Sequence, residues 1–414
     1  MTSSQNISHT DLIPRKVFFD NPDRICVRLS PDGTKIAYIA PYEGVMNIWV
    51  ADRNAPNDGK VLTKEPTRGL MSFSWAYTND HILYPKDTEG DENWHVHCVD
   101  IKTSQSKDLT PYGAVAARIS KMSTTFPQEI LVALNDRVPE LHDTYRVNIL
   151  TGARELVYEN SEFVGFLFDD TYTLRFAMRL LPDGSTQLDR YHEGAFSKFD
   201  HVPYEDALGT NPIGFNKEGD KLYTLDSRGR DTTGLYLVDI ENGKKELLAE
   251  HSNADISDAF LHPVTKEFEG WAATYLKKEW TFVNPKMQKD MDCLKQSANG
   301  VVEVLSRDLE DQYWVFIELQ DAGPSNYYLF DRASQEKTFL FSSQKSLEGL
   351  DLAHMHPVVI PARDGLEMVS YYTLPRGCDP KNDGAPQRPV PLILMVHGGP
   401  QARDSWGYNP SAQW

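Results

Sequence analysis

Short β-rich runs separated by polar turns recur along most of the chain. The first unit holds one run at residues 29–40 and a second at residues 47–52. It opens on the turn Pro31-Asp32-Gly33, in which proline presets φ and glycine accepts a positive φ. Apolar residues fill consecutive positions of the first run, which is typical of a strand buried on both faces. The pattern therefore predicts paired strands.

Six further units follow the same plan, the fourth weaker than the others and the sixth blurred. They lie at residues 75–100, 129–149, 163–181, 219–239, 260–282 and 313–331. The units recur at about 45 residues, the period of a four-stranded propeller blade. We therefore predict an all-β, seven-bladed β-propeller over residues 24–343. A β-sandwich array and a β-helix are the alternatives, but long β-helices use shorter repeats.

The repeating pattern of paired apolar runs ends after the seventh unit. Residues 356–375 indicate two strands around an Arg-Asp-Gly turn, and residues 391–396 form an apolar, strand-like run. This run opens into a His-Gly-Gly turn, which is how α/β-hydrolases build half of an oxyanion hole. We therefore predict that residues 344–414 are the opening strands of an incomplete α/β-hydrolase domain, and that residues 1–23 pack on it.

Composition narrows the class of protein. The 414 residues are 40% hydrophobic and 25% charged, as in soluble globular proteins, and the net charge of −18 argues against a nucleic-acid partner. No run of 18 apolar residues and no apolar leader occur, so no membrane span and no secretory signal are expected. The four cysteines are far apart and favour reduced thiols in a cytoplasmic protein.

The order of the motifs carries a family resemblance. The matching stretches lie at residues 12–15, 21–24, 29–33, 90–93, 226–232, 362–366, 372–375, 396–400 and 406–410. Together they resemble the prolyl oligopeptidase family of serine peptidases, and within it the acylaminoacyl-peptidase-like branch. The resemblance implies a propeller that caps a hydrolase domain and admits only short or N-acylated peptides, with no cofactor.

The resemblance also bears on the catalytic residues. The serine nucleophile would lie on a Gly-x-Ser-x-Gly turn, and no such sequence occurs among the 414 residues. The family's Ser, Asp and His would therefore lie beyond residue 414, and the chain alone is expected to be inactive. A propeller used only as a binding or scaffold module is the alternative. Oligomeric state, including a homo-oligomer, is left open.

The His-Gly-Gly-Pro turn supplies the candidate oxyanion hole. Glycine lets the backbone approach a ligand closely, so the N–H groups of Gly399 and Gly398 are the expected donors. Pro400 has no N–H and supports the loop only. His397 is expected to orient the loop through hydrogen bonds, because the catalytic His follows the nucleophile in this fold. An ordinary Gly-Gly turn after a strand is the alternative.

Three charged residues on loops between strands are candidate substrate contacts. Arg228 and Arg230 could bind a peptide carbonyl or carboxylate, or could instead hold their own loop through ion pairs with Asp226 and Asp231. Glu92 could bind a free peptide N-terminus, as propeller glutamates do in related dipeptidyl peptidases, or could lie in a solvated hairpin loop.

A His-x-His pair in the second unit has the spacing of two metal ligands on a strand. His95 and His97 would share one face of a strand, as two metal ligands require. No third ligand is evident near them in the sequence, so we expect no metal there.

Overall fold

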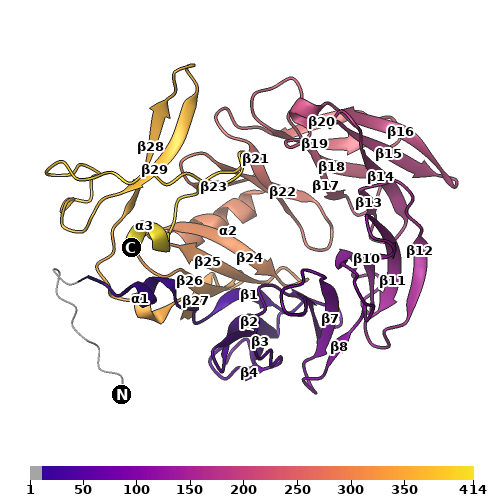
Figure 1. Ribbon diagram of the computed structural model, residues 1–414, viewed down its shortest axis with the longest axis horizontal. Helices are drawn as coiled ribbons and strands as arrows, with labels where there is room; N and C mark the ends of the chain where they lie inside the picture. The colour runs from indigo at the N-terminus through magenta and orange to yellow at the C-terminus, as the bar shows by residue number, and fades with distance from the viewer. Residues whose placement is uncertain (1–11) are drawn as a thin grey trace.

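The computed structural model describes residues 12–414, which form seven antiparallel sheets arranged as a ring and a separate two-stranded hairpin (Figure 1). The first four sheets each have four strands. They comprise β1 (Ile25–Leu29), β2 (Lys35–Tyr42), β3 (Val45–Asp52) and β4 (Lys60–Val61); β5 (Ser74–Trp75), β6 (His81–Lys86), β7 (His95–Asp100) and β8 (Ser106–Asp108); β9 (Ala117–Met122), β10 (Glu129–Val138), β11 (Leu141–Asn148) and β12 (Arg154–Tyr158); and β13 (Gly165–Phe168), β14 (Leu174–Leu180), β15 (Thr186–His192) and β16 (Ala195–Val202).

Three more sheets complete the ring, so the predicted seven-bladed propeller is confirmed. They comprise β17 (Asn211–Phe215), β18 (Lys221–Asp226), β19 (Gly234–Asp239) and β20 (Lys245–Ala249); β21 (Ile256–Leu261), β22 (Phe268–Thr274) and β23 (Lys278–Phe282); and β24 (Val301–Arg307), β25 (Tyr313–Leu319), β26 (Asn326–Asp331) and β27 (Glu336–Ser342). A short 3₁₀ turn, η1 (Tyr204–Asp206), lies between the fourth and fifth blades.

The predicted Pro-Asp-Gly turn starts the first blade. Gly33 has a φ of +68°, a conformation that residues with a Cβ adopt only under strain. The Asp32 carboxylate accepts hydrogen bonds from the Ser30 hydroxyl and the Thr34 N–H, at 2.6 and 3.0 Å. This local network turns the chain back, and β1 then pairs antiparallel with β2.

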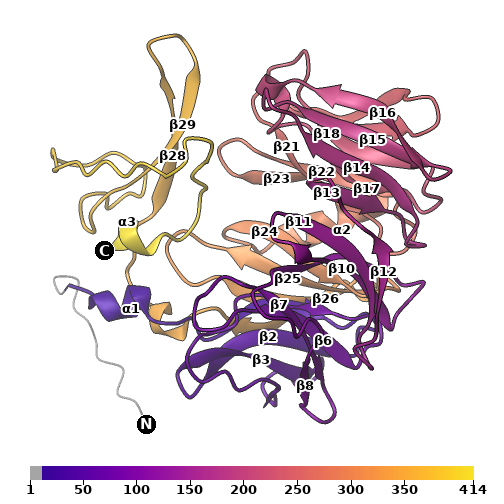
Figure 2. The same ribbon diagram turned by 45° about the vertical axis from the view of Figure 1, so that its right-hand side comes forward.

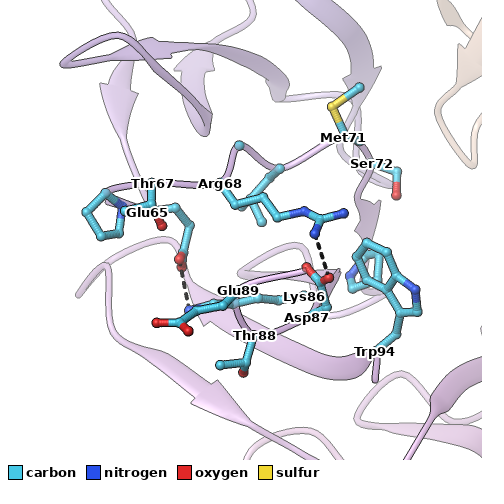
Figure 3. Close-up of a pocket in the computed structure, with 14 residues that line it drawn as sticks. Glu65, Thr67, Arg68, Met71, Ser72, Lys86, Asp87, Thr88, Glu89 and Trp94 are labelled. Carbon is cyan, nitrogen blue, oxygen red and sulfur yellow. Dashed lines mark ion pairs between the residues drawn. The ribbon is translucent and has the colours of Figure 1, made fainter. Parts of the chain in front are cut away.

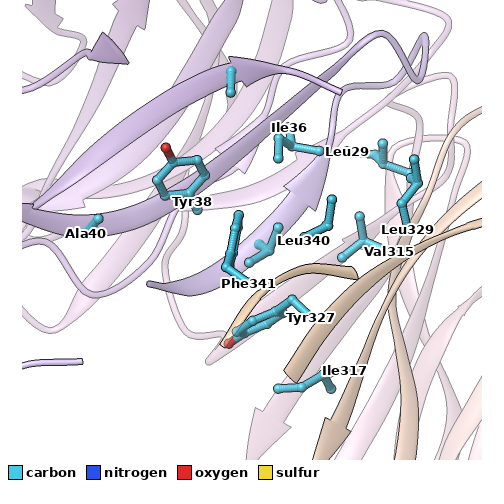
Figure 4. Packing of buried hydrophobic residues seen from close by; sticks show 12 residues of the cluster. Leu29, Ile36, Tyr38, Ala40, Val315, Ile317, Tyr327, Leu329, Leu340 and Phe341 are labelled. Atoms are coloured by element: carbon cyan, nitrogen blue, oxygen red, sulfur yellow. The ribbon is translucent and has the colours of Figure 1, made fainter. Parts of the chain in front are cut away.

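The ring closes where the first blade packs on the seventh (Figure 4). Tyr38 and Ile36 of β2 share a buried cluster with Val315 and Phe341. Two hydrogen bonds join the same blades: the Leu29 N–H donates to Ser306 Oγ at 2.9 Å, and the Leu309 N–H donates to the Pro31 carbonyl at 2.8 Å. Each of these two blades consists of consecutive strands, so no strand from one end of the chain completes a blade at the other end. Side-chain packing and the two hydrogen bonds therefore close the ring.

The sixth blade explains the blurred sixth unit. It has three strands, followed by the helix α2 (Pro285–Lys295), which the β pattern did not predict. The Asn284 side chain accepts a hydrogen bond from the Lys286 N–H and begins the helix. Its buried apolar side chains, Met287, Met291 and Leu294, pack in one cluster with aromatic residues of the sixth and seventh blades.

The chain beyond the ring forms less regular structure than expected. The predicted hairpin is confirmed as β28 (Met355–Pro361) and β29 (Glu367–Thr373). The expectation of a strand at residues 391–396 is wrong, because this run has no strand partner among the described residues and lies exposed, with Leu392 87% and Leu394 80% accessible. An extended segment without a neighbour cannot satisfy its backbone N–H and C=O groups with another strand.

Both ends of the described chain meet beside the seventh blade. The helix α1 (Arg15–Phe19) contacts the 3₁₀ turn η2 (Lys345–Leu347) and the terminal helix α3 (Pro410–Gln413). Phe18 is buried in this contact, and the rings of Phe19 and Trp414 lie 6.1 Å apart. Residues 1–11 of the expected N-terminal segment lie outside the described residues. The domain limits at residues 23 and 343 stay predictions.

Candidate active site and peptide-binding face

The topology of the blades gathers the candidate residues at one face of the ring. In an antiparallel meander, the turn after the second strand and the chain leaving the fourth strand lie at the same end. Four turns follow the second strand of a blade, namely those after β6, β18, β22 and β25. Residues 62–73 leave the fourth strand of the first blade. Figure 2 shows the C-terminal segment, in yellow, standing off this side of the propeller.

Hydrogen bonds hold the C-terminal segment to that face. Arg403 donates through Nη2 to the Tyr275 carbonyl at 2.6 Å, and the Tyr408 N–H donates to the Gln320 carbonyl at 2.8 Å. The hairpin is held in the same way, because the Tyr371 hydroxyl donates to the Leu276 carbonyl at 2.9 Å. Lys277 Nζ lies 3.6 Å from the ring centre of Trp406. The turns of the sixth and seventh blades therefore carry the segment that contains the His-Gly-Gly-Pro loop.

The His-Gly-Gly-Pro loop is exposed and is organised mainly by its own atoms. His397 Nδ1 lies 2.9 Å from the Gly398 carbonyl, to which it can donate, and the Ala402 N–H donates to the Pro400 carbonyl at 2.9 Å. Gly399 has a φ of +145°, which disfavours any side chain. Within residues 12–414, the N–H groups of Gly398 and Gly399 have no hydrogen-bond partner. They are therefore free to donate to a ligand, although the oxyanion role stays a prediction.

Arg228 is fully engaged inside the propeller. Its guanidinium donates to both carboxylate oxygens of Asp226, to both of Asp200 and to the His201 carbonyl, at 2.7–2.9 Å. Lys245 Nζ adds a contact of 2.7 Å to Asp226. Arg228 thus joins the fourth blade to the fifth, and this geometry favours the structural interpretation over substrate binding.

Opposing effects act on the pKa of Asp226. Burial by itself raises the pKa of this carboxyl, but the hydrogen bonds from Arg228, Lys245 and the backbone outweigh it and hold the pKa well below its usual range. The same carboxylates of Asp226 and Asp200 raise the pKa of Arg228. Asp226 and Arg228 therefore both stay ionised at neutral pH.

Arg230 is also bound within its own region, although not by the expected partner. Its Nη2 contacts Glu250 at 2.6 Å, Nη1 donates to the Tyr236 hydroxyl at 2.8 Å, and Nε donates to the Thr232 carbonyl at 2.6 Å. The sequence suggested Asp231 for this ion pair, but the strand pairing brings Glu250 to the guanidinium instead. Substrate contacts by the two arginines stay predictions.

A pocket opens beside the loop that carries Glu92 (Figure 3). It has a volume of about 450 Å³ and lies between residues 65–72, which connect the first blade to the second, and residues 85–94. Glu92 itself is exposed with a φ of +58° and does not line the pocket. Glu89, three residues earlier, does line it.

Two ion pairs cross this pocket (Figure 3). Lys86 Nζ lies 2.8 Å from Glu65 Oε2, and Arg68 Nη1 lies 2.9 Å from Asp87 Oδ2. The Asp87 side chain is only 3% exposed, so it needs the guanidinium as a partner. Sequence reasoning missed Arg68 because no catalytic motif surrounds it. The signal that could have indicated the site is Trp94, an aromatic residue directly after the Gly-Asp-Glu-Asn stretch.

The His-x-His pair has a structural partner. His95 Nδ1 lies 2.7 Å from Asp108 Oδ2, and His97 Nε2 lies 4.0 Å from the same oxygen. Burial lowers the pKa of His97. In the described part of the chain, no group of three or more His, Cys, Asp or Glu side chains could hold a metal ion. No helix within residues 12–414 is long and apolar enough to cross a membrane.

Comparison with known proteins finds curated relatives that are named as dipeptidyl peptidases. No protein-family model matches the chain. Dipeptidyl aminopeptidase BIII of Pseudoxanthomonas mexicana is 40% identical over 415 residues, which cover 100% of this chain and 60% of that protein. Dipeptidyl peptidase family member 6 of Caenorhabditis elegans is 27% identical over 441 residues, covering 99% of this chain and 60% of that protein. The chain therefore spans about 60% of the length of these relatives.

Solved structures agree on the fold. A puromycin hydrolase matches with a TM-score of 0.66 and 14% identity, over 96% of this chain and 65% of that one. The acylaminoacyl peptidase of Pyrococcus horikoshii matches with a TM-score of 0.60 and 13% identity, over 96% of this chain and 64% of that one. The likeness to the prolyl oligopeptidase family is thus confirmed. The chain is a homologue of dipeptidyl peptidases, and its likeness to the acylaminoacyl peptidase is one of fold.

Proposed function

We propose that this chain forms the substrate-admitting part of a serine peptidase that acts on short peptides, with release of dipeptides as its expected reaction. The observation that carries the proposal is the His-Gly-Gly-Pro loop, whose free glycine N–H groups are exposed on the segment tied to one propeller face. The names of the curated relatives support a dipeptidyl peptidase over an acylaminoacyl peptidase.

The proposed chemistry is acyl transfer. A serine hydroxyl adds to the scissile carbonyl while a histidine takes its proton, and the carbonyl oxygen becomes an anion. Gly399 and Gly398 donate their N–H groups to that oxygen, and His397 holds the loop through the Gly398 carbonyl. The propeller face admits only substrates that are small enough to reach the loop. Serine, histidine and aspartate are not assigned to residues of this chain.

A first test uses the protein isolated intact from its own cells, with its mass measured. It is incubated with one peptide in two forms, with a free and with an acetylated N-terminus, and the products are identified by mass spectrometry. We expect dipeptides from the free form only. Release of N-acetylated residues would establish the acylaminoacyl alternative, and internal fragments would establish an endopeptidase.

A second test addresses the oxyanion loop. Gly399→Ala places a side chain at a φ of +145°, so the backbone must shift and move the N–H away from the oxyanion. This should lower kcat by about 10²–10³-fold, as loss of one oxyanion donor does. Gly365→Ala is the matched control, because Gly365 also has a positive φ, +91°, but lies in the hairpin turn. Equal losses in both variants would mean that general distortion of the segment causes the effect.

A binding or scaffold module is the second candidate function. It is favoured by one observation, that the propeller carries a pocket of about 450 Å³ lined by the exposed apolar side chains of Met71 and Trp94. A fluorophosphonate probe separates the two candidates on the intact protein, because labelling that a peptide substrate blocks requires an activated serine. We expect the 414-residue chain alone to remain unlabelled, and stoichiometric labelling of it would show that one of its own residues is the nucleophile.

A further inference from the structure

The pocket between the first and second blades has apolar walls that face solvent. Trp94 is 37% exposed and Met71 is 70% exposed, although both are large apolar side chains. Pro66, Leu70 and Pro85 also line the pocket. Its volume of about 450 Å³ is within the range of sites that hold small ligands. Apolar surface left open in a concavity is typical of a binding site.

The charges of the pocket are compensated except at one position. Lys86 pairs with Glu65, and Arg68 pairs with the buried Asp87. Glu89 has no ion-pair or hydrogen-bond partner among residues 12–414, so one carboxylate remains unneutralised in the lining. A ligand group in this pocket therefore meets apolar walls and a net negative charge, which disfavours anionic groups.

Trp94 is held from one side by Arg68, whose guanidinium carbon lies 5.7 Å from the indole ring centre. Since Asp87 fixes Arg68 through its Nη1, the indole is supported in a defined position. A preorganised aromatic wall costs little conformational entropy when a second ring or an aliphatic chain packs on it. The thioether of Met71 adapts to irregular apolar groups and packs well on aromatic rings.

We propose that this pocket binds one aromatic or large aliphatic side chain of a peptide, and that Trp94 is a specificity-determining residue. The pocket belongs to the same propeller face as the turns that hold the segment with the His-Gly-Gly-Pro loop, so both are open to a peptide on that face. Selection of substrates by this pocket rests on the proposed peptidase function. Binding of a peptide to the pocket does not require that function and concerns the 414-residue chain alone.

The first experiment measures peptide binding to the 414-residue chain by calorimetry. Three pentapeptides differ only at the central residue, which is Phe, Ala or Asp in a glycine background. We expect the Phe peptide to bind at least about 10-fold more tightly than the Ala peptide, and the Asp peptide most weakly. Trp94→Ala should abolish the preference for Phe, and Trp94→Phe should restore most of it.

The matched control is Leu208→Ala, because Leu208 is 72% exposed on a blade-to-blade connection at the same face but lies outside the pocket. It should leave all three affinities unchanged. Thermal unfolding of each variant shows that it is folded. Unchanged preference in Trp94→Ala, an equal loss in Leu208→Ala or equal binding of the Phe and Asp peptides would each overturn the proposal.

The second experiment separates this inference from the proposed function. In the intact protein, kcat/KM is measured for Phe and Ala versions of one substrate, with and without Trp94→Ala. If peptides are cleaved but Trp94→Ala leaves the Phe-to-Ala ratio unchanged, selection by this pocket is refuted and the peptidase function stands. If no peptide is cleaved but the chain still binds the Phe peptide through Trp94, the peptidase function fails and the binding site stands.

Discussion

Two apolar runs of this chain have similar composition and opposite structural outcomes. In β25 (Tyr313–Leu319) the residues Trp314 and Val315 are fully buried, and the strand pairs with β24 on one side and β26 on the other. Residues 391–396 are equally apolar, yet Leu392 and Ile393 are 87% and 85% exposed and form no strand. The difference shows that apolar content indicates a tendency to extend, whereas neighbours on both sides make a strand.

The largest expected contrast between the two regions is in hydrogen exchange. Amides of residues 222–225 in β18 should exchange at least about 10³-fold more slowly than those of residues 391–397, because core amides exchange only after costly opening. Exchange mass spectrometry at several dilutions measures this. Equal protection of both stretches in a monodisperse monomer would show that residues 391–397 have found a partner surface within the chain.

A second contrast compares one buried and one exposed apolar side chain. Trp314→Ala should lower the free energy of unfolding by about 3–5 kcal/mol, through a cavity and through loss of the hydrogen bond from Trp314 Nε1 to Asp311 at 2.7 Å. Leu394→Ala, at 80% exposure, should change it by less than about 0.5 kcal/mol. Denaturant titration followed by circular dichroism measures both. A large loss in Leu394→Ala would contradict the exposed state of residues 391–396.

Arg228 and Arg230, which lie in the same turn between β18 and β19, offer a third contrast. Arg228→Leu leaves Asp226 and Asp200 without their main partner, and should cost about 3 kcal/mol of unfolding free energy. Arg230→Leu loses an ion pair with Glu250, whose side chain is 59% exposed, and should cost less than about 1 kcal/mol. If peptide binding is instead weakened without loss of stability, Arg228 contacts substrate after all.

The smallest expected effect is a pH dependence carried by Asp226. Because its pKa in the folded state lies below the unfolded value of about 3.9, ionised Asp226 stabilises the fold above that pH. The contribution should be lost progressively as the pH falls below about 4. Unfolding free energies measured between pH 5 and 2.5 should decrease less steeply in Asp226→Asn than in the wild type. Identical slopes would show that other carboxyl groups carry the acid sensitivity.

Structure that depends on neighbouring residues could be predicted from the sequence, whereas structure that depends on distant segments could not. The unit around Pro31-Asp32-Gly33 was predictable because turn and strand signals lie within a few residues of one another. The helix α2 was missed because its buried side chains, such as Met287 and Met291, are defined by contact with a neighbouring blade. The strand at residues 391–396 was predicted wrongly for the same reason, since pairing depends on distant segments.

In the candidate site, too, contiguous motifs could be predicted from the sequence and contacts between distant segments could not. The sequence located Gly398, Gly399 and their loop, because the His-Gly-Gly-Pro motif is contiguous. It proposed Glu92 but could not find the pocket, whose walls come from residues 65–72 and from the loop after β6. It also could not identify Glu250 as the partner of Arg230, because strand pairing alone brings them together.

By itself, the sequence determined the number and order of the blades, since turn residues and short apolar runs act over a few positions and repeat along the chain. Only the tertiary structure decided which apolar run became a strand, which carboxylate met each arginine and where a pocket opened. Hydrogen-bond ladders, ion pairs and cavities form between segments far apart in sequence. Their geometry is set by the closure of the ring, which no local pattern contains.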